Sequence, residues 1–456
     1  MLFADAQRYL LSLGHETLTI KLGLENTERL LAALGNPHKS FPSVQIAGTN
    51  GKGSTAIMLE SICCEAGIRT GLFTSPHLIS ITERIRIDGK QISESEFARL
   101  TGRVKQAAEQ LLKQGNLQTL PTFFEHVTAI ALLAFQEANV EFAILETGLG
   151  GRLDSTTAAG AQIVAITSIA MDHQEYLGDT LAEIAAEKAA IIQPGLIAIV
   201  APQAEEATEV LLRRCGEVAV APSWIGEVEP RDSRSSAGPA HYRSRFCDAL
   251  SDGRICVTFE TPSKQYENVC LGLRGRHQIT NAATAVALAE ALREHRFAIR
   301  DDAIVRGLQR AQHAGRLELW DEVAPPILFD GAHNPAAARA LRDYLDEFVN
   351  QPITMIFGAM RDKALDEIAA VLFSAAKQIV LTPLDNPRAA TVERLQAEVP
   401  SHFDQSRIHH ARSVADACQI ARQITGAHSM IVVTGSLYLV GAVQEILTPL
   451  CRKITV

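Results

Sequence analysis

The chain has 456 residues, more than one hydrophobic core usually serves, so two or three domains are expected. Hydrophobic residues make up 47% of the chain and charged residues 21%, which is the balance of an ordinary globular enzyme. The 43 lysines and arginines stand against 52 aspartates and glutamates, and this net charge of −9 argues against a nucleic-acid partner and against an anionic membrane surface.

The lack of a recognisable targeting signal and the spacing of the cysteines both favour a cytoplasmic protein. The start, MLFADAQRYLLSLGHE, lacks the basic segment, apolar core and cleavage site of a signal peptide. No apolar run approaches the roughly 18 residues needed to span a bilayer. The cysteines form no C-x-x-C pair, so we expect all of them to be reduced. They are Cys63, Cys64, Cys215, Cys247, Cys256, Cys270, Cys418 and Cys451.

Apolar strand-like runs alternate with segments of helical period, which is typical of parallel α/β proteins. The predicted strands are 42–47, 70–74, 140–146, 161–167, 196–201, 255–259, 327–330, 353–357, 378–381 and 430–434. The predicted helices are 55–66, 94–113, 123–138, 181–191, 280–294 and 335–348.

Two stretches interrupt this alternation. Residues 222–245 are polar and rich in serine, arginine and proline, which indicates a surface excursion. Charge density rises over REHRFAIR (293–300), between two helical patterns. We therefore predict a first domain over 1–296 and a second over 297–456. The second has βαβ units but no phosphate loop of its own.

The strongest local signal is GTNGKGST, which follows the first predicted strand and precedes a helix. Glycines let the backbone wrap around an anion, and successive N–H groups at a helix N-terminus favour phosphate. The lysine can reach phosphate oxygens, and a hydroxyl can be offered to Mg²⁺. The predicted ATP-binding residues are Gly48, Thr49, Asn50, Gly51, Lys52, Gly53, Ser54 and Thr55. The alternative is a glycine-rich turn with an incidental lysine.

The spacing differs from a standard phosphate loop, and GTNGKGS resembles the form found in the Mur ligase and folylpolyglutamate synthase superfamily. Further segments resemble that family in the family's order. They are TSPHL (74–78), ERIRI (83–87), TFFE (122–125), LETGLGGRLD (145–154), TSIAMDHQEYLG (167–178), EKAAI (187–191), NAATA (281–285), GRLE (315–318), FDGAHNP (329–335) and TGSLYLVG (434–441). The TSPHL, ERI and LETGLGGRLD pieces resemble the folate branch rather than the cell-wall branch.

The resemblance implies a site for magnesium, with two ions expected, held by Ser75, Glu146, His173 and Lys188. Glu146 ends a predicted strand, where ligands of parallel sheets gather. A lysine ammonium has no lone pair for a metal, so the resemblance also implies that Lys188 is carbamylated by CO₂. The alternatives are a capping or core histidine at His173 and, for Lys188, a lysine that snorkels from an alanine-rich helix.

The resemblance also implies where folate binds, around Thr122, Phe123, Phe124, Glu125, Leu153, Asp154 and Ser155. There a ring can stack on the pterin and a carboxylate can bond to its nitrogens, although helical spacing alone would make Phe124 a core aromatic. The chain departs from relatives at His126, a position that is often aromatic. It also has Ser155-Thr156-Thr157 where Ala-Thr-Asn is usual. Both departures bear on substrate preference rather than on the reaction.

Later residues match family positions for nucleotide and amino acid. Asn281, Arg316 and Asp330 match ATP contacts, while His333, Lys363 and Ser436 match groups near glutamate. For the last three, surface or capping roles are the alternative, and Ala364 replaces the aspartate that usually follows the lysine. The catalytic candidates are Lys52, Lys188 and His333.

Together these features imply an N-terminal P-loop ATPase domain with a mainly parallel sheet and a C-terminal Rossmann-like α/β domain. The implied reaction joins L-glutamate to the carboxylate of dihydropteroate or a reduced folate through an acyl phosphate, using ATP and magnesium. We expect a monomer. Two alternatives stay open: a ligase acting on a UDP-muramyl substrate, and a regulatory P-loop ATPase without ligase chemistry. Sequence does not reveal which folate is preferred or how many glutamates are added.

Overall fold

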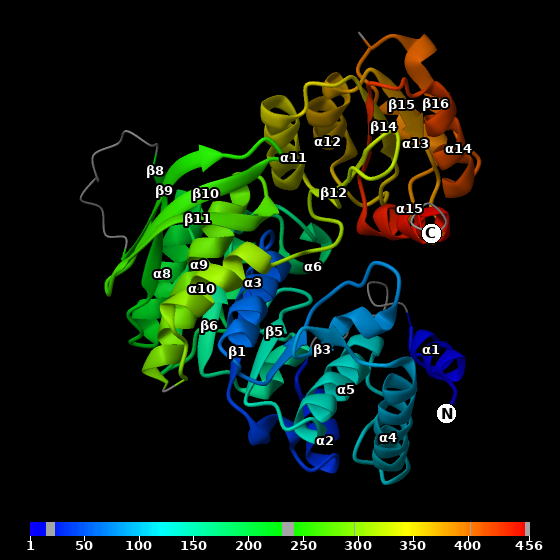
Figure 1. The fold of residues 1–456 in the computed structure, drawn as a ribbon. Helices are drawn as coiled ribbons and strands as arrows, with labels where there is room; N and C mark the ends of the chain where they lie inside the picture. Colours follow the sequence, from blue (N-terminus) through cyan, green and yellow to red (C-terminus); the bar gives the residue numbers. More distant parts are fainter. Residues whose placement is uncertain (15–22, 230–240, 296, 402, 452–456) are drawn as a thin grey trace. The chain divides into compact units, whose positions relative to one another are not determined.

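The computed structural model describes residues 1–14, 23–229, 241–295, 297–401 and 403–451 (Figure 1). Contacts divide the chain into two compact units. Unit 1 comprises Met1–Cys247, Val257–Cys270 and Ile279–Ala311, and unit 2 comprises Asp248–Cys256, Leu271–Gln278 and Gln312–Val456. Arg296, the predicted boundary, lies outside the described residues.

Helix α10 (Asp301–Arg310) belongs to unit 1 because it packs closely on α3 (Lys52–Glu65). Gly307 makes this approach possible, since a Cβ there would lie 2.5 Å from Ile62 Cα. Ser61 Oγ donates to the Gly307 carbonyl at 2.8 Å. The change of unit at 311–312 thus comes one helix after the charged segment that suggested a boundary.

The first sheet has 11 strands in the order β11-β10-β9-β8-β7-β6-β1-β5-β2-β3-β4. Their bounds are β1 Ser43–Ala47, β2 Thr70–Phe73, β3 Ile85–Ile87, β4 Lys90–Gln91, β5 Phe142–Glu146, β6 Ile163–Ile166, β7 Ile197–Val200, β8 Ser223–Glu229, β9 Tyr242–Ala249, β10 Arg254–Glu260 and β11 Gln265–Arg274. The central run β2-β5-β1-β6-β7-β8 is parallel. Strands β1 and β5 are buried along their whole length, and this includes the polar residues Ser43 and Gln45 of β1 and Glu146 of β5.

Helices cover this sheet, and their boundaries follow capping signals. Helix α5 (Phe123–Glu137) begins at a capping box formed by Thr122 and Glu125. Helix α7 (Leu181–Ala189) begins at a second box, formed by Thr180 and Glu183. The other helices here are α1 Phe3–Ser12, α2 Glu25–Ala33, α4 Glu94–Lys113, α6 Gln174–Leu177, α8 Glu205–Glu217 and α9 His277–Glu294, with the short 3₁₀ helices η1 Pro37–Ser40, η2 Ile81–Arg84 and η3 Ser155–Ala159.

The second sheet has six strands in the order β12-β13-β17-β14-β15-β16, with only β12 antiparallel to its neighbour. They are β12 Glu318–Trp320, β13 Ile327–Phe329, β14 Ile353–Phe357, β15 Gln378–Leu381, β16 Ile408–His410 and β17 Met430–Thr434. Its helices are α11 Pro335–Phe348, α12 Leu365–Leu372, α13 Val392–Ala397, α14 Val414–Ile424 and α15 Leu437–Cys451, with η4 Phe373–Ala375 and η5 Gln405–Arg407. The predicted fold class, two α/β units with mainly parallel sheets, is confirmed.

Two expectations need correction. The polar stretch 222–245 is not wholly irregular, because β8 and the start of β9 lie within it; residues 230–240 are outside the described part.

Cys256 and Cys270 are disulfide-bonded, so the prediction of reduced cysteines is wrong for these two. They lie on the neighbouring strands β10 and β11, a proximity that linear spacing did not reveal. No helix among the described residues is long and apolar enough to cross a membrane.

Candidate active site

The carboxyl ends of four neighbouring parallel strands bring the early predicted residues to one edge of the first sheet. Strand β1 leads into Gly48, β5 ends at Glu146, β2 is followed closely by Ser75, and β6 leads into the segment that contains His173. Ligands of open parallel sheets bind outside this edge. The structure therefore places these candidates where a common site can form.

The phosphate loop has the close packing that its glycines suggested. Gly48 and Gly51 both have positive φ, at 149° and 91°. A Cβ on Gly48 would overlap Thr167, and one on Gly51 would overlap Asn281 of α9. The Asn281 side chain, predicted to contact ATP, thus lies directly against the phosphate loop. The loop ends where α3 begins at Lys52, so the helix N-terminus faces the same region.

Two lysines converge on this loop. Lys52 Nζ donates to the carbonyls of Gly48 and Thr49, both at 3.1 Å. Lys188 Nζ, from α7, donates to the same Gly48 carbonyl at 2.9 Å. Burial, followed by the positive charge of Lys52, lowers the pKa of Lys188 to about 7. A large fraction of Lys188 is therefore an uncharged amine near neutral pH, which makes it a nucleophile.

The predicted metal ligands share short contacts. The Ser75 backbone N–H donates to Glu146 Oε2 at 3.0 Å, so these two neighbours are directly linked. His173 is the residue before α6, in a left-handed conformation with φ 52°, and its backbone N–H donates to Asp172 Oδ1 at 2.9 Å. Asp172 in turn acts electrostatically on Lys188. Asp172 precedes His173 in the matched segment but was not among the predicted site residues.

These protein groups suit magnesium only if oxygens from nucleotide phosphates and water complete the coordination of the ion. No three His, Cys, Asp or Glu side chains converge on a common point in the part of the chain that the structure describes. Glu146, which is 5% exposed, supplies a carboxylate. Magnesium keeps several waters and binds through one or two carboxylates plus substrate phosphates, so this sparse set fits a metal that arrives with a nucleotide. Thr55 Oγ1 is buried and, among the described residues, has no hydrogen-bond partner.

The predicted folate-binding segment Thr122–Glu125 lies at the start of α5, where helix capping and packing of aromatic rings hold it in place. Glu125 Oε2 accepts from the Thr122 N–H at 2.6 Å, and Glu125 Oε1 accepts from Thr27 Oγ1 at 3.3 Å. Phe123 is buried with the Arg84 guanidinium 5.4 Å from its ring centre. The Phe124 ring lies against Phe73, with centroids 5.8 Å apart. Arg84 and Phe73 were not predicted; only the ERIRI match had drawn attention to Arg84.

His126, the departure from an aromatic residue, is fully buried beneath this segment. Its Nδ1 lies 3.1 Å from the Thr122 carbonyl, and its Nε2 lies 3.0 Å from Tyr9 Oη of α1. A carbonyl can only accept, so Nδ1 carries the proton and Nε2 accepts from the tyrosine. Burial lowers the pKa of His126 to about 4, which keeps the ring neutral.

In unit 2, the later candidates lie at the carboxyl ends of three neighbouring strands. Asp330 follows β13, and its carboxylate accepts from the backbone N–H groups of Leu317 and Ala332 at 3.0 and 2.9 Å. Burial raises its pKa, with the Arg316 charge acting in the opposite direction. His333 Nδ1 lies 2.8 Å from the Gly331 carbonyl and must donate to it. Ser436 follows β17, where its Oγ accepts from Tyr438 N at 3.2 Å, and Lys363 follows β14.

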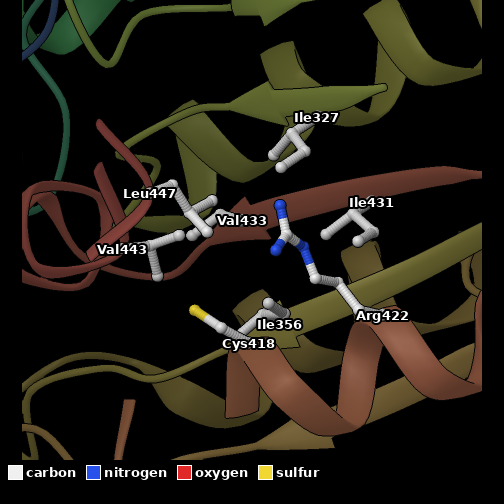
Figure 2. A pocket seen from close by; sticks show the side chains of 8 residues that line it. All are labelled: Ile327, Ile356, Cys418, Arg422, Ile431, Val433, Val443 and Leu447. Atoms are coloured by element: carbon white, nitrogen blue, oxygen red, sulfur yellow. The ribbon is translucent and has the colours of Figure 1, made fainter. Parts of the chain in front are cut away.

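A small pocket elsewhere in unit 2 contains none of the predicted residues. It lies against β13, β14 and β17 and is bounded by α14 and α15. Figure 2 shows the Arg422 side chain extending from α14 among aliphatic side chains. The lining residues are Ile327, Ile356, Cys418, Arg422, Ile431, Val433, Val443 and Leu447. This mostly aliphatic lining offers no acid–base pair or glycine-rich loop, so the pocket is not a candidate for the chemistry.

The two units match known domain families. Residues 46–289 match the Mur ligase middle domain, and residues 315–437 match the Mur ligase glutamate ligase domain. The first match alone spans more than half of the chain. The chain belongs to the Mur ligase family. It is therefore an ATP-dependent ligase, and the predicted family and enzyme class are confirmed.

Relatives of this Mur ligase carry folate-related names. It is 35% identical over 443 residues to the dihydrofolate synthase/folylpolyglutamate synthase of Bacillus subtilis (strain 168), covering 95% of this chain and 96% of the relative. An E. coli relative solved in complex with DHPP and ADP shares 31% identity and a TM-score of 0.85, with 99% of each chain covered. The Yersinia pestis bifunctional folylpolyglutamate synthase/dihydrofolate synthase, complexed with AMPPNP and Mn, shares 28% identity and a TM-score of 0.81, with 98% of each chain covered.

Proposed function

We propose that this Mur ligase joins L-glutamate to the carboxylate of dihydropteroate, of a reduced folate, or of both, with conversion of ATP to ADP and phosphate. The observation that carries the proposal is the convergence of Lys52 and Lys188 on the Gly48 carbonyl at the edge where Glu146 also lies. The relatives' names and bound DHPP, ADP and AMPPNP support the substrate class. We expect the reaction to occur in the cytoplasm, and one chain supplies every assigned residue.

The first step forms an acyl phosphate. A carboxylate oxygen of the pteroate or folate attacks the γ-phosphorus, and the bond to ADP breaks. In this proposal the phosphate loop, Gly48 to Thr55, holds the triphosphate with its N–H groups while Lys52 balances charge on the transferring phosphoryl group. Asn281, Arg316 and Asp330 contact the nucleotide. Thr122–Glu125 and residues 153–155 orient the pterin end, so that the reacting carboxylate meets the γ-phosphate in line.

Magnesium, when bound, supplies positive charge that stabilises the phosphoryl oxygens. Ser75, Glu146, His173 and Lys188 would hold two such ions. The Lys188 role requires carbamylation: its neutral amine attacks CO₂, an N–C bond forms and one proton leaves. The lowered pKa of Lys188, caused mainly by burial, favours this reaction near neutral pH. The product is an anionic oxygen ligand where an ammonium would repel metal.

The second step forms the amide. The glutamate nitrogen attacks the acyl carbon, the tetrahedral oxyanion collapses, and phosphate leaves. We assign glutamate contacts to His333, Lys363 and Ser436. Because His333 Nδ1 donates to the Gly331 carbonyl, Nε2 is the basic nitrogen of the neutral ring. It is therefore suited to orient the amine or to take its proton.

An ADP-release assay tests the proposal. The purified chain is supplied with ATP, magnesium and L-glutamate, and in turn with dihydropteroate, tetrahydrofolate or a UDP-muramyl peptide. We expect ADP release, and one new amide per ADP by mass spectrometry, with at least one folate compound and only when glutamate is present. Release without glutamate or acceptor would indicate an ATPase instead. Turnover only with the muramyl peptide would move the chain to the cell-wall branch.

A further inference from the structure

A set of hydrogen bonds links the centre of β1 to the loop that follows β5. Gln45 Nε2 lies 3.0 Å from Thr156 Oγ1, 2.7 Å from Thr157 Oγ1 and 3.3 Å from Thr147 Oγ1. Thr156 Oγ1 donates to Asp154 Oδ1 at 2.6 Å, and Thr157 Oγ1 donates to the Gly151 carbonyl at 2.7 Å. Each hydroxyl has one hydrogen, which is thereby used, so both hydroxyls accept from Gln45. The two amide hydrogens of Gln45 are thus offered to three hydroxyl oxygens, and the two shorter bonds go to Thr156 and Thr157.

Asp154 extends this network through the whole loop. Its Oδ1 also accepts from the Thr156 N–H at 3.0 Å, and its Oδ2 accepts from the Gly148 and Leu149 N–H groups at 3.0 and 2.9 Å. A carboxylate has about four acceptor sites, and four donors of its own loop use them here. Burial raises the pKa of Asp154, and these hydrogen bonds oppose that shift. The carboxylate therefore shapes the loop, and contact with a substrate falls to neighbouring groups of the segment.

The loop held in this way touches two parts of the candidate active site. The Gly148 backbone lies against the Phe124 ring, which a Cβ at position 148 would overlap. Gly151 packs on α7, where an added Cβ would lie 3.1 Å from Lys188 Cα. The Arg152 N–H donates to the Glu187 carbonyl at 3.0 Å on the same helix. The shape of one loop therefore sets the separation between Phe124 and Lys188.

We propose that Gln45 is a positioning residue for the ligase reaction. By holding Thr156 and Thr157, it keeps loop 148–157 in the one shape that sets the folate-contacting segment at a fixed distance from the lysine that serves the metal site. Gln45 is 2% exposed and lies within β1, three residues before the phosphate loop, so it acts through the loop and not on substrate. This inference rests on the proposed function.

A matched pair at Thr157 gives the sharpest test. Thr157→Val keeps the shape and removes the hydroxyl, whereas Thr157→Ser keeps the hydroxyl. Gln45→Met removes both amide donors at similar length, and the double variant Gln45→Met/Thr157→Val tests coupling. Thr101→Val is the control, because Thr101 is a buried threonine on α4 whose hydroxyl donates within its own helix, to the Phe97 carbonyl at 2.7 Å. For each variant we would measure Tm, kcat, and KM for both ATP and the accepted folate compound.

A misplacement of about 1 Å can cost as much as 10²-fold in rate, so we expect Thr157→Val and Gln45→Met each to lower kcat/KM for the folate compound at least about 10-fold. KM for ATP should stay within about twofold of the wild-type value, since the phosphate loop is not displaced. Thr157→Ser and Thr101→Val should behave like wild type. The double variant should lose no more than the worse single variant, because the two residues share one network.

Equal behaviour of Thr157→Val and Thr157→Ser in a folded protein would overturn the inference. So would losses that simply follow Tm and raise KM for ATP in parallel. Should Gln45→Met fail to fold, the Thr157 pair decides alone. If the wild-type chain makes no glutamyl amide with any folate compound, it is the proposed function that fails, and the variants are then irrelevant.

Discussion

The two units present the same kind of sheet edge and use it differently. At the edge of unit 1, the carbonyls of Gly48 and Thr49 hold two lysine side chains, so positive charge is gathered above a glycine-rich loop. At the edge of unit 2, Asp330 and His333 are bound to neighbouring backbone groups instead. The first arrangement suits transfer of an anionic group, and the second suits orientation of a polar substrate. The comparison implies that substitutions in unit 1 stop the chemistry, whereas those in unit 2 change substrate use.

The largest effect is expected for Lys52→Ala. Losing one charge contact to the transferring phosphoryl group costs on the order of 10²-fold or more in kcat. The fold should persist, because Lys52 is not part of a hydrophobic core cluster and its bonds to the Gly48 and Thr49 carbonyls lie within the loop itself. Steady-state ADP release and a thermal melt check both statements, with the exposed Lys113→Ala on α4 as control. Near-normal turnover in a folded Lys52→Ala protein would contradict the assignment of the phosphate loop.

Lys188→Ala should be nearly inactive and partly restored by acetate, which supplies a carboxylate in place of the carbamate. Because burial lowers the pKa of Lys188 to about 7, the neutral amine that reacts with CO₂ becomes the major form above that pH. After CO₂ depletion, the wild-type protein should therefore regain activity faster at pH 8 than at pH 6 when both samples receive the same concentration of dissolved CO₂. Full activity without CO₂, together with the mass of an unmodified chain, would show that no carbamate is needed.

In unit 2, His333→Ala should raise KM for glutamate about 10-fold or slow amide formation, leaving ATP use nearly unchanged. Acyl-phosphate formation should persist, since it precedes amine attack. Asp330→Ala should weaken ATP use instead. It also leaves the Leu317 and Ala332 N–H groups without their acceptor, at a cost of about 1–3 kcal/mol per group, so Asp330→Asn is the better-folded comparison. Titrations of ATP and of glutamate on each variant test this; reversed assignments would show the division of roles to be wrong.

The smallest expected effect concerns one histidine in each unit. Burial lowers the pKa of both His126 and His277 to about 4 from an ordinary 6.5. Below pH 6.5 the unfolded chain binds a proton that the folded chain does not, so stability falls as pH decreases towards 4. Each ring should cost about 2 kcal/mol between pH 7 and pH 5. Urea unfolding at both pH values should show this loss reduced in His126→Gln and in His277→Gln. Equal losses in variants and wild type would contradict it.

Sequence periodicity predicted the strands that are buried on both faces, and missed those that are not. Strands β1, β5 and β14 are mainly apolar and buried on both faces, and they were predicted to within one or two residues. Strands β8 and β9 carry alternating polar residues at one side of the first sheet, where composition resembles that of a loop. The helix 94–113 matched α4 because its apolar residues recur on one face. The disulfide at Cys256 and Cys270 depends on strand pairing, which spacing cannot supply.

The site was predictable where a motif carries it and not where packing does. The phosphate loop and the resemblance of later segments named Lys52, Glu146 and Lys188. No sequence signal showed that Lys188 would reach the Gly48 carbonyl from 140 residues away, or that Gln45 would bond three threonines after β5. These contacts depend on which strands are neighbours. The sequence pattern predicts that β1 and β5 are strands, but it does not predict that they pair with each other in the sheet.

The left-handed backbone of His173 carries a consequence for the evolution of this chain. A non-glycine residue at φ 52° costs about 1 kcal/mol that glycine would avoid. Glycine would relieve this cost, so we expect that the imidazole serves the proposed metal site at some expense of stability, the trade-off of a functional position. His173→Gly should accordingly melt no lower than the wild-type protein and yet lose metal-dependent turnover. If the melting temperature of His173→Gly falls together with its activity, His173 has a structural role and there is no trade-off between stability and function at this position.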